Sequence, residues 1–179
     1  ITDLAEGVRD GAAARAANDL LYAQRHGRVS AELVILSVEL DSGLLIITRC
    51  GQTPVFVRLP GEEVEFLESE SPALGFYRMA RPVIDHVPLT PGLLVVACTD
   101  GLINAGSTHR QVWDVGEAIE SLWQVDGSAQ GIADGLMARA LELDDERPRD
   151  DISVVALHVT SGPEVGPRRL IVEMPLPNR

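Results

Sequence analysis

Three aspartates stand where an apolar, strand-like run ends or begins. Asp3 closes the short apolar start of the chain, Asp100 directly follows the run 93–99, and Asp150 precedes the run 152–157. A carboxylate at the lip of a buried strand is partly desolvated, which is costly unless the group is paired, hydrogen-bonded or bound to a metal. Several such groups meeting at one sheet edge would repel each other unless a cation lay between them. The pattern therefore indicates a metal site with these three aspartates as candidate ligands.

Each aspartate taken alone has a simpler interpretation. Asp100 is followed by Gly101, and Asp-Gly is a common turn signal. Asp150 and Asp151 can merely end a loop before a strand. Spacing in the sequence does not by itself bring the three positions together, so both interpretations stay open at this point.

Other polar residues give weaker signals. Arg9 stands in the loop after Asp3, and a guanidinium is suited to bidentate recognition of phosphate, although an exposed loop arginine is more often simply solvated. The four histidines are scattered and no two have ligand-like spacing. His109, soon after Asp100, is the only one to watch. The acidic runs 62–65 and 144–146 are typical of solvated surface.

Composition limits the class of protein. The chain has 179 residues, which is the size of one domain, and a net charge of -12. This charge argues against a nucleic-acid partner, because a phosphate backbone requires patches of Lys and Arg. No apolar run is long enough to span a bilayer, and no basic-then-apolar leader opens the sequence. Cys50 and Cys98 lie inside apolar runs and indicate buried thiols in a reducing cytoplasm.

Local signals predict hairpins with helices before and after them. Residues 12–24 are rich in Ala and Leu and predict a helix that ends at Gly27. Asp114 and Ser128 are expected to cap two later helices. Apolar and β-branched runs predict strands at 33–40, 44–50, 55–59, 64–67, 83–87, 92–99, 151–159 and 169–174. This arrangement favours an α+β domain built around antiparallel sheet.

Several of these segments resemble one bacterial family. Thr99-Asp100-Gly101-Leu102 with Ala105 resembles the S/T-D-G-L-x-x-A motif of the stage II sporulation protein E-like phosphatases. The run from Asp150 to Leu157 resembles their closing D-D-x-T/S strand. Residues 72–75 and 89–92 are similar to the family's P-L-G and L-x-P-G-D turns, and 33–54 looks like its central hairpin, which usually ends in N-A-G-H-x-P. The resemblance covers nearly the whole chain.

The resemblance implies a fold and a site. The fold is a four-layer α-β-β-α sandwich of two antiparallel sheets flanked by helices, and two Mn²⁺ or Mg²⁺ ions would sit at the sheet edge. In the family pattern Asp3 bridges the two ions and the carbonyl of Leu4 is an extra ligand. Asp100 and Asp150 match the other aspartate ligands, and Asp151 stands where relatives outside this branch carry Asn. Hard oxygen ligands suit both ions.

The resemblance also implies an activity and a partner. Water activated by the two metals would attack phosphoserine or phosphothreonine without a covalent phosphoenzyme. The substrate would be a phosphorylated anti-anti-sigma factor of STAS type, or a similar protein of stress signalling and sigma-factor regulation. Residues 1–160 would form the phosphatase domain, and 161–179 a C-terminal extension that adds an edge strand. Whether the chain forms a homodimer stays open.

Three departures from the family pattern support an alternative. The family's first aspartate lies on an upstream strand, so we expect this chain to lack its N-terminal strands and at least one ligand. Residues 5–11 replace a G-H-G-like loop, and Gln52 replaces the histidine of the G-H-x-P segment. The alternative is a catalytically impaired module with the phosphatase fold that serves in protein binding or sensing.

Overall fold

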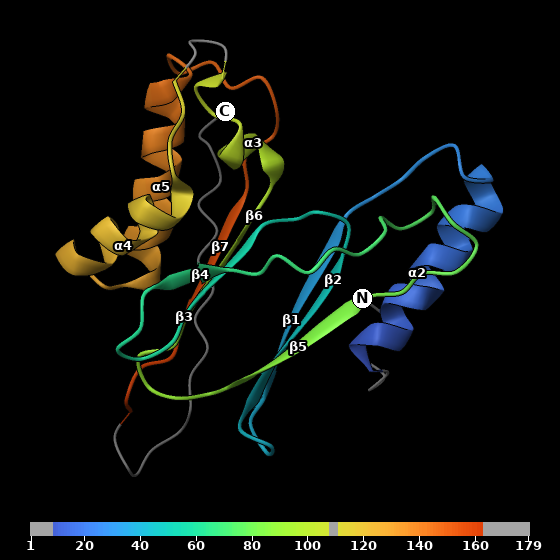
Figure 1. The fold of residues 1–179 in the computed structure, drawn as a ribbon, viewed down its shortest axis with the longest axis horizontal. Coiled ribbons are helices and arrows are strands. Elements are labelled where there is room, and N and C mark those ends of the chain that lie inside the picture. The colour runs from blue at the N-terminus through green and yellow to red at the C-terminus, as the bar shows by residue number, and fades with distance from the viewer. Residues whose placement is uncertain (1–8, 108–110, 163–179) are drawn as a thin grey trace, which may run out of the picture.

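The computed structural model describes residues 9–107 and 111–162 (Figure 1). Two antiparallel sheets form its centre. One sheet has the order β1-β2-β5, with β1 (Leu33–Glu39), β2 (Leu44–Cys50) and β5 (Val83–Pro88). The other has the order β4-β3-β6-β7, with β3 (Val55–Arg58), β4 (Val64–Phe66), β6 (Leu94–Cys98) and β7 (Val154–His158). The helices are α2 (Asp10–Arg25), α3 (Asp100–Ile103), α4 (Val115–Val125) and α5 (Ala129–Leu143).

The two sheets differ in their helical cover. Helix α2 lies beside the β1-β2-β5 sheet, whereas α3, α4 and α5 gather beside the other sheet (Figure 1). Between β5 and β6 the chain leaves the first sheet and enters the second. The mixture of antiparallel sheets and segregated helices confirms the predicted α+β class.

Strand β6 shows how the period of two in a strand builds two cores at once. Its residues Val95 and Ala97 join an apolar cluster with β2, β3 and β5, between the sheets. The alternate residues of β6, including Val96, join a second cluster with α3, α4 and α5. All of β6 is buried, as expected for a central strand with cover on both faces. A smaller cluster, with Ala14 of α2 and Cys50 of β2, lies on the far side of the first sheet.

Most of the predicted elements are confirmed with small shifts in their bounds. The hairpin turns at 41–43 and 60–61 join β1 to β2 and β3 to β4 in antiparallel pairs. Asp114 accepts a hydrogen bond from Glu117 N, and Ser128 accepts one from Gly131 N, so both predicted caps are present. The predicted strand 169–174 and the predicted strand end at Asp3 lie outside the described residues.

Two expectations need correction, and the expected end of α2 needs an addition. The predicted strand at 151–159 is shorter, since β7 begins only at Val154. Helix α2 ends at Arg25, and Gly27 has the positive φ expected of it, 77°, but His26 before it is also left-handed at φ 50°. The short helix α3 was not predicted, so Asp100 opens a helical turn rather than simply following a strand.

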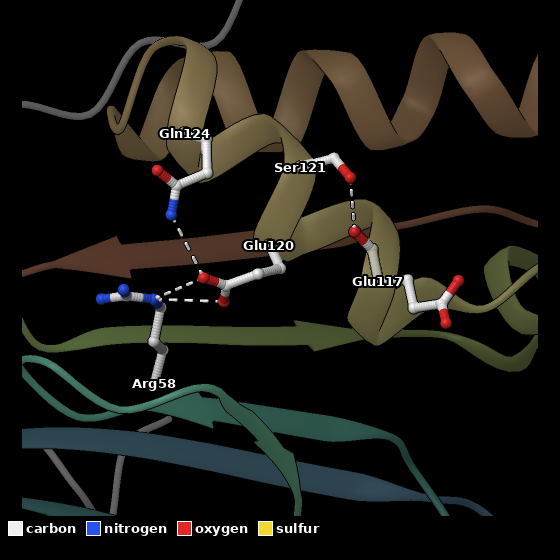
Figure 2. A network of polar contacts seen from close by, with 5 residues as sticks. All are labelled: Arg58, Glu117, Glu120, Ser121 and Gln124. Atoms are coloured by element: carbon white, nitrogen blue, oxygen red, sulfur yellow. Dashed lines mark hydrogen bonds and ion pairs between the residues drawn. The ribbon is translucent and has the colours of Figure 1, made fainter.

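The end of the second sheet that includes Arg58 is held by a group of polar and aromatic contacts, which we call the Arg58 cluster. Arg58 of β3 donates from Nε to the Glu120 carboxylate of α4 at 3.2 Å, as Figure 2 shows. Gln124 donates to the same carboxylate at 3.4 Å. The Arg58 guanidinium also lies 4.7 Å from the centre of the Trp123 ring, and Trp123 meets the His158 ring edge to face at 4.8 Å. The cluster fastens α4 to β3 and β7.

None of the helices in the described part of the chain combines the length and apolarity that a bilayer crossing requires.

Candidate functional site

Strands β6 and β7 bring two of the predicted aspartate segments to one edge of the second sheet. The strands are antiparallel, and Cys98 at the end of β6 pairs with Val154 at the start of β7. The chain therefore leaves β6 at Thr99 beside the residues that enter β7. Asp100 and Asp150 belong to these two adjoining segments, although fifty residues separate them in the sequence.

Thr99 ties the two segments together. Its hydroxyl donates to the Asp151 carbonyl oxygen at 2.8 Å and accepts from the Ser153 backbone N–H at 2.9 Å. The Thr99 backbone N–H donates to the Ser153 carbonyl at 3.1 Å. Threonine at this position is also the residue before α3, where its side chain would normally cap the helix, but the hydroxyl makes no capping bond. The side chain serves the junction instead of the helix.

Gly101 allows the closest approach between the two segments. A Cβ atom added to Gly101 would lie 2.6 Å from the Asp151 carbonyl oxygen and 3.1 Å from its carbonyl carbon. Real Cβ atoms do not approach backbone oxygen so closely, so any side chain would push the segments apart. The Thr-Asp-Gly sequence thus has a physical reason at each end: Thr99 fastens the neighbouring segment, and Gly101 leaves room for it.

The aspartates at this junction keep their carboxylates in solvent, so the partial desolvation expected from their place at strand ends is not found. Asp100, Asp150 and Asp151 are all exposed, and none forms an ion pair with another described residue. Asp150 Oδ1 accepts from the Asp151 backbone N–H at 2.8 Å, which fixes the turn before β7. Free carboxylate oxygens at a rigid junction are suited to binding a cation or to polar contact with a ligand.

A cleft of about 820 Å³ opens beside Asp100. The turn from Gly51 to Pro54 forms part of its wall, and Glu32 holds this turn by accepting from the Gln52 backbone N–H at 3.0 Å and from the Thr53 hydroxyl at 2.8 Å. Gly51 has φ 95°, a conformation that favours glycine. Glu32 therefore fixes the segment where the family pattern has its histidine.

Neither cysteine of the chain is suited to act as a nucleophile. Cys98 directly precedes the junction and is buried, and burial raises the pKa of its thiol to about 12. Burial also raises the pKa of Cys50, partly opposed by a hydrogen bond with Ser71. Both sulfurs therefore stay protonated near neutral pH, whereas the reactive form of cysteine is the thiolate. Chemistry at this edge is left to the carboxylates.

The donor chemistry of the junction fits Mn²⁺ or Mg²⁺ only as part of a larger ligand set. Asp100 and Asp150 offer the hard carboxylate oxygens that these ions prefer. Within residues 9–107 and 111–162, however, no three His, Cys, Asp or Glu residues are arranged to hold a metal ion. The predicted bridging residue Asp3, and Leu4 with it, lie outside the described residues. A complete site would thus need ligands beyond those at the junction.

The remaining predicted residues have mixed outcomes. Arg9 is exposed just before α2, and its side chain makes no hydrogen bond or ion pair with another described residue. Its predicted contact with substrate phosphate stays a prediction. His109 lies outside the described residues.

Sequence reasoning also missed residues that shape the cleft. Glu32 and Arg49 carry no motif, and their partners are distant in the sequence, so no local signal could have found them.

Asp144 was expected on the solvated surface but is only 9% exposed. Its carboxylate accepts from the Gly106 backbone N–H at 2.9 Å and so anchors the loop after α3.

Comparisons with known proteins agree with this geometry. Residues 4–160 match the family model of stage II sporulation protein E. Protein IcfG of Synechocystis sp. is 27% identical over 150 residues, which cover 82% of this chain and 23% of that protein. The chain thus spans about a quarter of the length of this relative.

Solved structures share the fold. The phosphatase domain of the cell fate determinant SpoIIE from Bacillus subtilis is 18% identical and superposes with a TM-score of 0.63, over 92% of this chain and 73% of that one. The serine/threonine phosphatase PstP/Ppp of Mycobacterium tuberculosis is 15% identical, with a TM-score of 0.60 over 80% and 68% of the two chains. A catalytic domain of PstP, 18% identical with a TM-score of 0.64 over 84% and 70% of the chains, was solved in complex with two manganese ions.

Proposed function

Because this chain belongs to the stage II sporulation protein E family, whose members are PP2C-type serine/threonine phosphatases, we propose that it hydrolyses phosphoserine or phosphothreonine in a phosphorylated regulatory protein. The observation that carries the proposal is the junction made by Thr99. It holds Asp100 beside the segment of Asp150, with both carboxylates exposed and without a basic partner among the described residues. Asp100 also lines the cleft, so a ligand bound there could reach its carboxylate.

Two Mn²⁺ or Mg²⁺ ions are the proposed cofactors, held by Asp100 and Asp150 together with Asp3, the carbonyl of Leu4 and Asp151. When bound, such ions offset the charge of the phosphoryl group and lower the pKa of water. The chain's own residues keep the ligands in place: Thr99 and the tight contact at Gly101 fix the spacing between the two aspartate segments. Phosphorus would be attacked by water, and the serine or threonine oxygen would leave.

The finer assignments follow the family pattern. We propose that the helices and the two sheets stack as the four-layer α-β-β-α sandwich of the family. Residues 1–160 are proposed to form the phosphatase domain. Arg9 is proposed to contact substrate phosphate. The substrate is proposed to be an anti-anti-sigma factor of STAS type or a similar protein of the cytoplasm, which would connect the chain to stress response through sigma-factor regulation.

The test is phosphate release by the intact protein that contains this chain. Phosphate should appear from a phosphoserine peptide with Mn²⁺ or Mg²⁺ and not after removal of metal by EDTA. Asp100→Asn should lower kcat/KM at least about a hundredfold, because one ligand is lost, and should leave the melting temperature unchanged or slightly higher. Full activity of Asp100→Asn would contradict the assigned role.

One observation supports the impaired alternative. Gln52 occupies the position of the family's histidine, and Glu32 holds this turn by accepting from the Gln52 backbone N–H and the Thr53 hydroxyl. Calorimetry with Mn²⁺ separates the two functions, because an impaired module should give no heat of binding while the enzyme should bind the ion with an affinity that Asp100→Asn weakens.

A further inference from the structure

The cleft beside Asp100 extends well beyond the aspartate junction. On the sheet side it is lined by β4 and by the segment 67–70 that follows. On the helix side it is lined by residues of α3, by Trp113 in the segment before α4, and by the start of α4, including Gly116. A cleft of about 820 Å³ is larger than a single phosphoserine side chain requires. The rest of its length is free to receive residues on either side of the phosphorylated one.

The charge of the lining is strongly negative. The carboxylates that line the cleft are Glu32, Glu68, Glu70, Asp100 and Asp114, and Arg49 is the basic residue among the lining residues. Arg49 is only 4% exposed, and its guanidinium is already paired with Asp85 at 3.0 Å. Among the described residues, the lining therefore offers no free cation to an acidic substrate segment.

Two of these carboxylates are not committed elsewhere. Glu32 accepts hydrogen bonds from the Gln52 backbone N–H and the Thr53 hydroxyl. Asp114 caps α4, and Asp100 belongs to the proposed metal site. Glu68 and Glu70 are exposed and form no hydrogen bond or ion pair with a described residue. They could therefore pair with a basic side chain in the cleft without breaking a hydrogen bond or ion pair to a described residue.

Apolar surface lies open beside these charges. Phe66 of β4 is 48% exposed and Ile103 of α3 is 37% exposed, and both line the cleft. Phe66 rests against Phe56 with the ring centres 5.3 Å apart, which limits its movement. Large exposed apolar side chains in a cleft with charged neighbours are typical of a binding surface.

The wall that carries Glu68 is fixed from both sheets. Arg49 of β2 donates from Nη1 to the Leu67 carbonyl at 2.7 Å while it pairs with Asp85 of β5. The Leu67 backbone N–H donates to the Val55 carbonyl at 2.9 Å. Because the wall is held before a ligand arrives, less conformational entropy is lost on binding.

We propose that this cleft selects the sequence around the phosphorylated residue: it binds an extended substrate segment with a basic residue facing Glu68 and Glu70 and an apolar residue against Phe66 and Ile103. This inference rests on the proposed phosphatase function and names the substrate class of the same site. Exposed charge pairs contribute modestly, so two of them give a preference of about five- to tenfold.

The test uses two phosphoserine peptides of equal length, one with Arg and one with Glu on both sides of the phosphoserine. The intact protein should show a kcat/KM about five- to tenfold higher on the Arg peptide, and less so at high salt. Glu68→Lys with Glu70→Lys should remove or reverse this preference while the rate on para-nitrophenyl phosphate, which lacks flanking residues, is unchanged.

A matched control has the same change in net charge outside the cleft. Glu62→Lys with Glu63→Lys alters two exposed carboxylates of the β3–β4 turn, which do not line the cleft, and should keep the preference of the wild type. Equal kcat/KM on both peptides, or a loss of preference in the control as large as in the Glu68 and Glu70 variant, would overturn the inference.

Binding separates this inference from the proposed function. Fluorescence anisotropy with Asp100→Asn protein should show tighter binding of the Arg peptide than of the Glu peptide, and Glu68→Lys with Glu70→Lys should abolish the difference. If no substrate is hydrolysed but this difference is found, the phosphatase function fails and the cleft assignment holds. If hydrolysis is found and the difference is not, the cleft assignment fails alone.

Discussion

The two ends of the β4-β3-β6-β7 sheet treat charge in opposite ways. At one end Leu94 pairs with Arg58 and with His158. There the Arg58 cluster joins a cation to a carboxylate (Figure 2) and also includes two aromatic rings. At the other end, where Cys98 pairs with Val154, the backbone and the Thr99 hydroxyl are bonded while the aspartate carboxylates stay unpaired among the described residues. One end uses charge to fasten a helix to the sheet, and the other leaves charge available for a ligand.

Of the changes considered for the two ends of this sheet, Gly101→Ala should have the largest effect on stability and on phosphatase rate. The added methyl group would meet the Asp151 carbonyl at 2.6 Å, so the two aspartate segments must separate. We expect a loss of about 1–3 kcal/mol in the free energy of unfolding and a large fall in Mn²⁺-dependent phosphatase rate. Urea unfolding and phosphate release measure the two effects.

Gly162→Ala is the matched control for this change. A Cβ at Gly162 would have nothing within 4 Å, and its φ is not in the left-handed region. This variant should keep wild-type stability and rate. If Gly101→Ala behaves in the same way, close contact is not what sets the geometry of the junction.

Thr99→Val should have a smaller effect at the same end. The substitution keeps the shape of the side chain but removes the hydroxyl that bonds Asp151 and Ser153. We expect a loss of about 1 kcal/mol of stability and a weaker apparent affinity for Mn²⁺ in activity assays. Thr99→Ser restores the hydroxyl and should recover most of both. Equal Mn²⁺ affinity in the valine and serine variants would speak against the hydroxyl as the positioning group.

Glu120→Gln changes the end of the sheet that carries the Arg58 cluster, and it should lower the stability less than Thr99→Val does. The ion pair with Arg58 is partly open to solvent, with side chains 12% and 32% exposed, so its contribution is screened. We expect a loss below about 1 kcal/mol that shrinks further in high salt, with no change in phosphatase rate. A fall in rate comparable to that of Thr99→Val would show that the two ends are coupled.

His158→Gln should have the smallest effect on stability, and the effect should be visible only in how the stability depends on pH. Burial lowers the pKa of His158 in the folded protein below its usual value of 6.5. The folded state therefore favours the neutral ring, so the stabilisation is present above about pH 6.5 and is lost as the pH falls toward the lower folded value. Urea midpoints at pH 7.5 and 5.5 should differ more for the wild type than for His158→Gln. Equal differences would contradict a partly buried imidazole that the fold keeps neutral.

Local signals account for the parts of the fold that the sequence predicted. The turn glycines at 43 and 61 and the caps Asp114 and Ser128 act within three or four residues, so each can be seen in a short window. The assignment of β5 and β6 to different sheets depends on pairing between distant segments and has no such signal. Helix α3 has only four residues, too few to show a helical period.

The candidate site divides in the same way. The motif around Asp100 marks the edge of the sheet where Thr99 and Gly101 make their contacts, while the metal site predicted there stays a prediction. Glu32 acts on a turn twenty residues away, and the Arg49 bond to Leu67 depends on how two sheets pack. Such contacts exist only after the chain has folded, and a single sequence does not display them.

The contacts of the Thr99 hydroxyl also set an order of events during synthesis. They join residues 52 and 54 positions apart, and the intervening chain contains both α4 and α5. A nascent chain that stops before β7 can form β6 and its neighbours, yet it has no partner for this hydroxyl and no second aspartate. The proposed phosphatase activity would therefore arise only after β7 has been synthesised, and a ribosome-stalled chain ending at residue 145 should be inactive however well its earlier strands have formed.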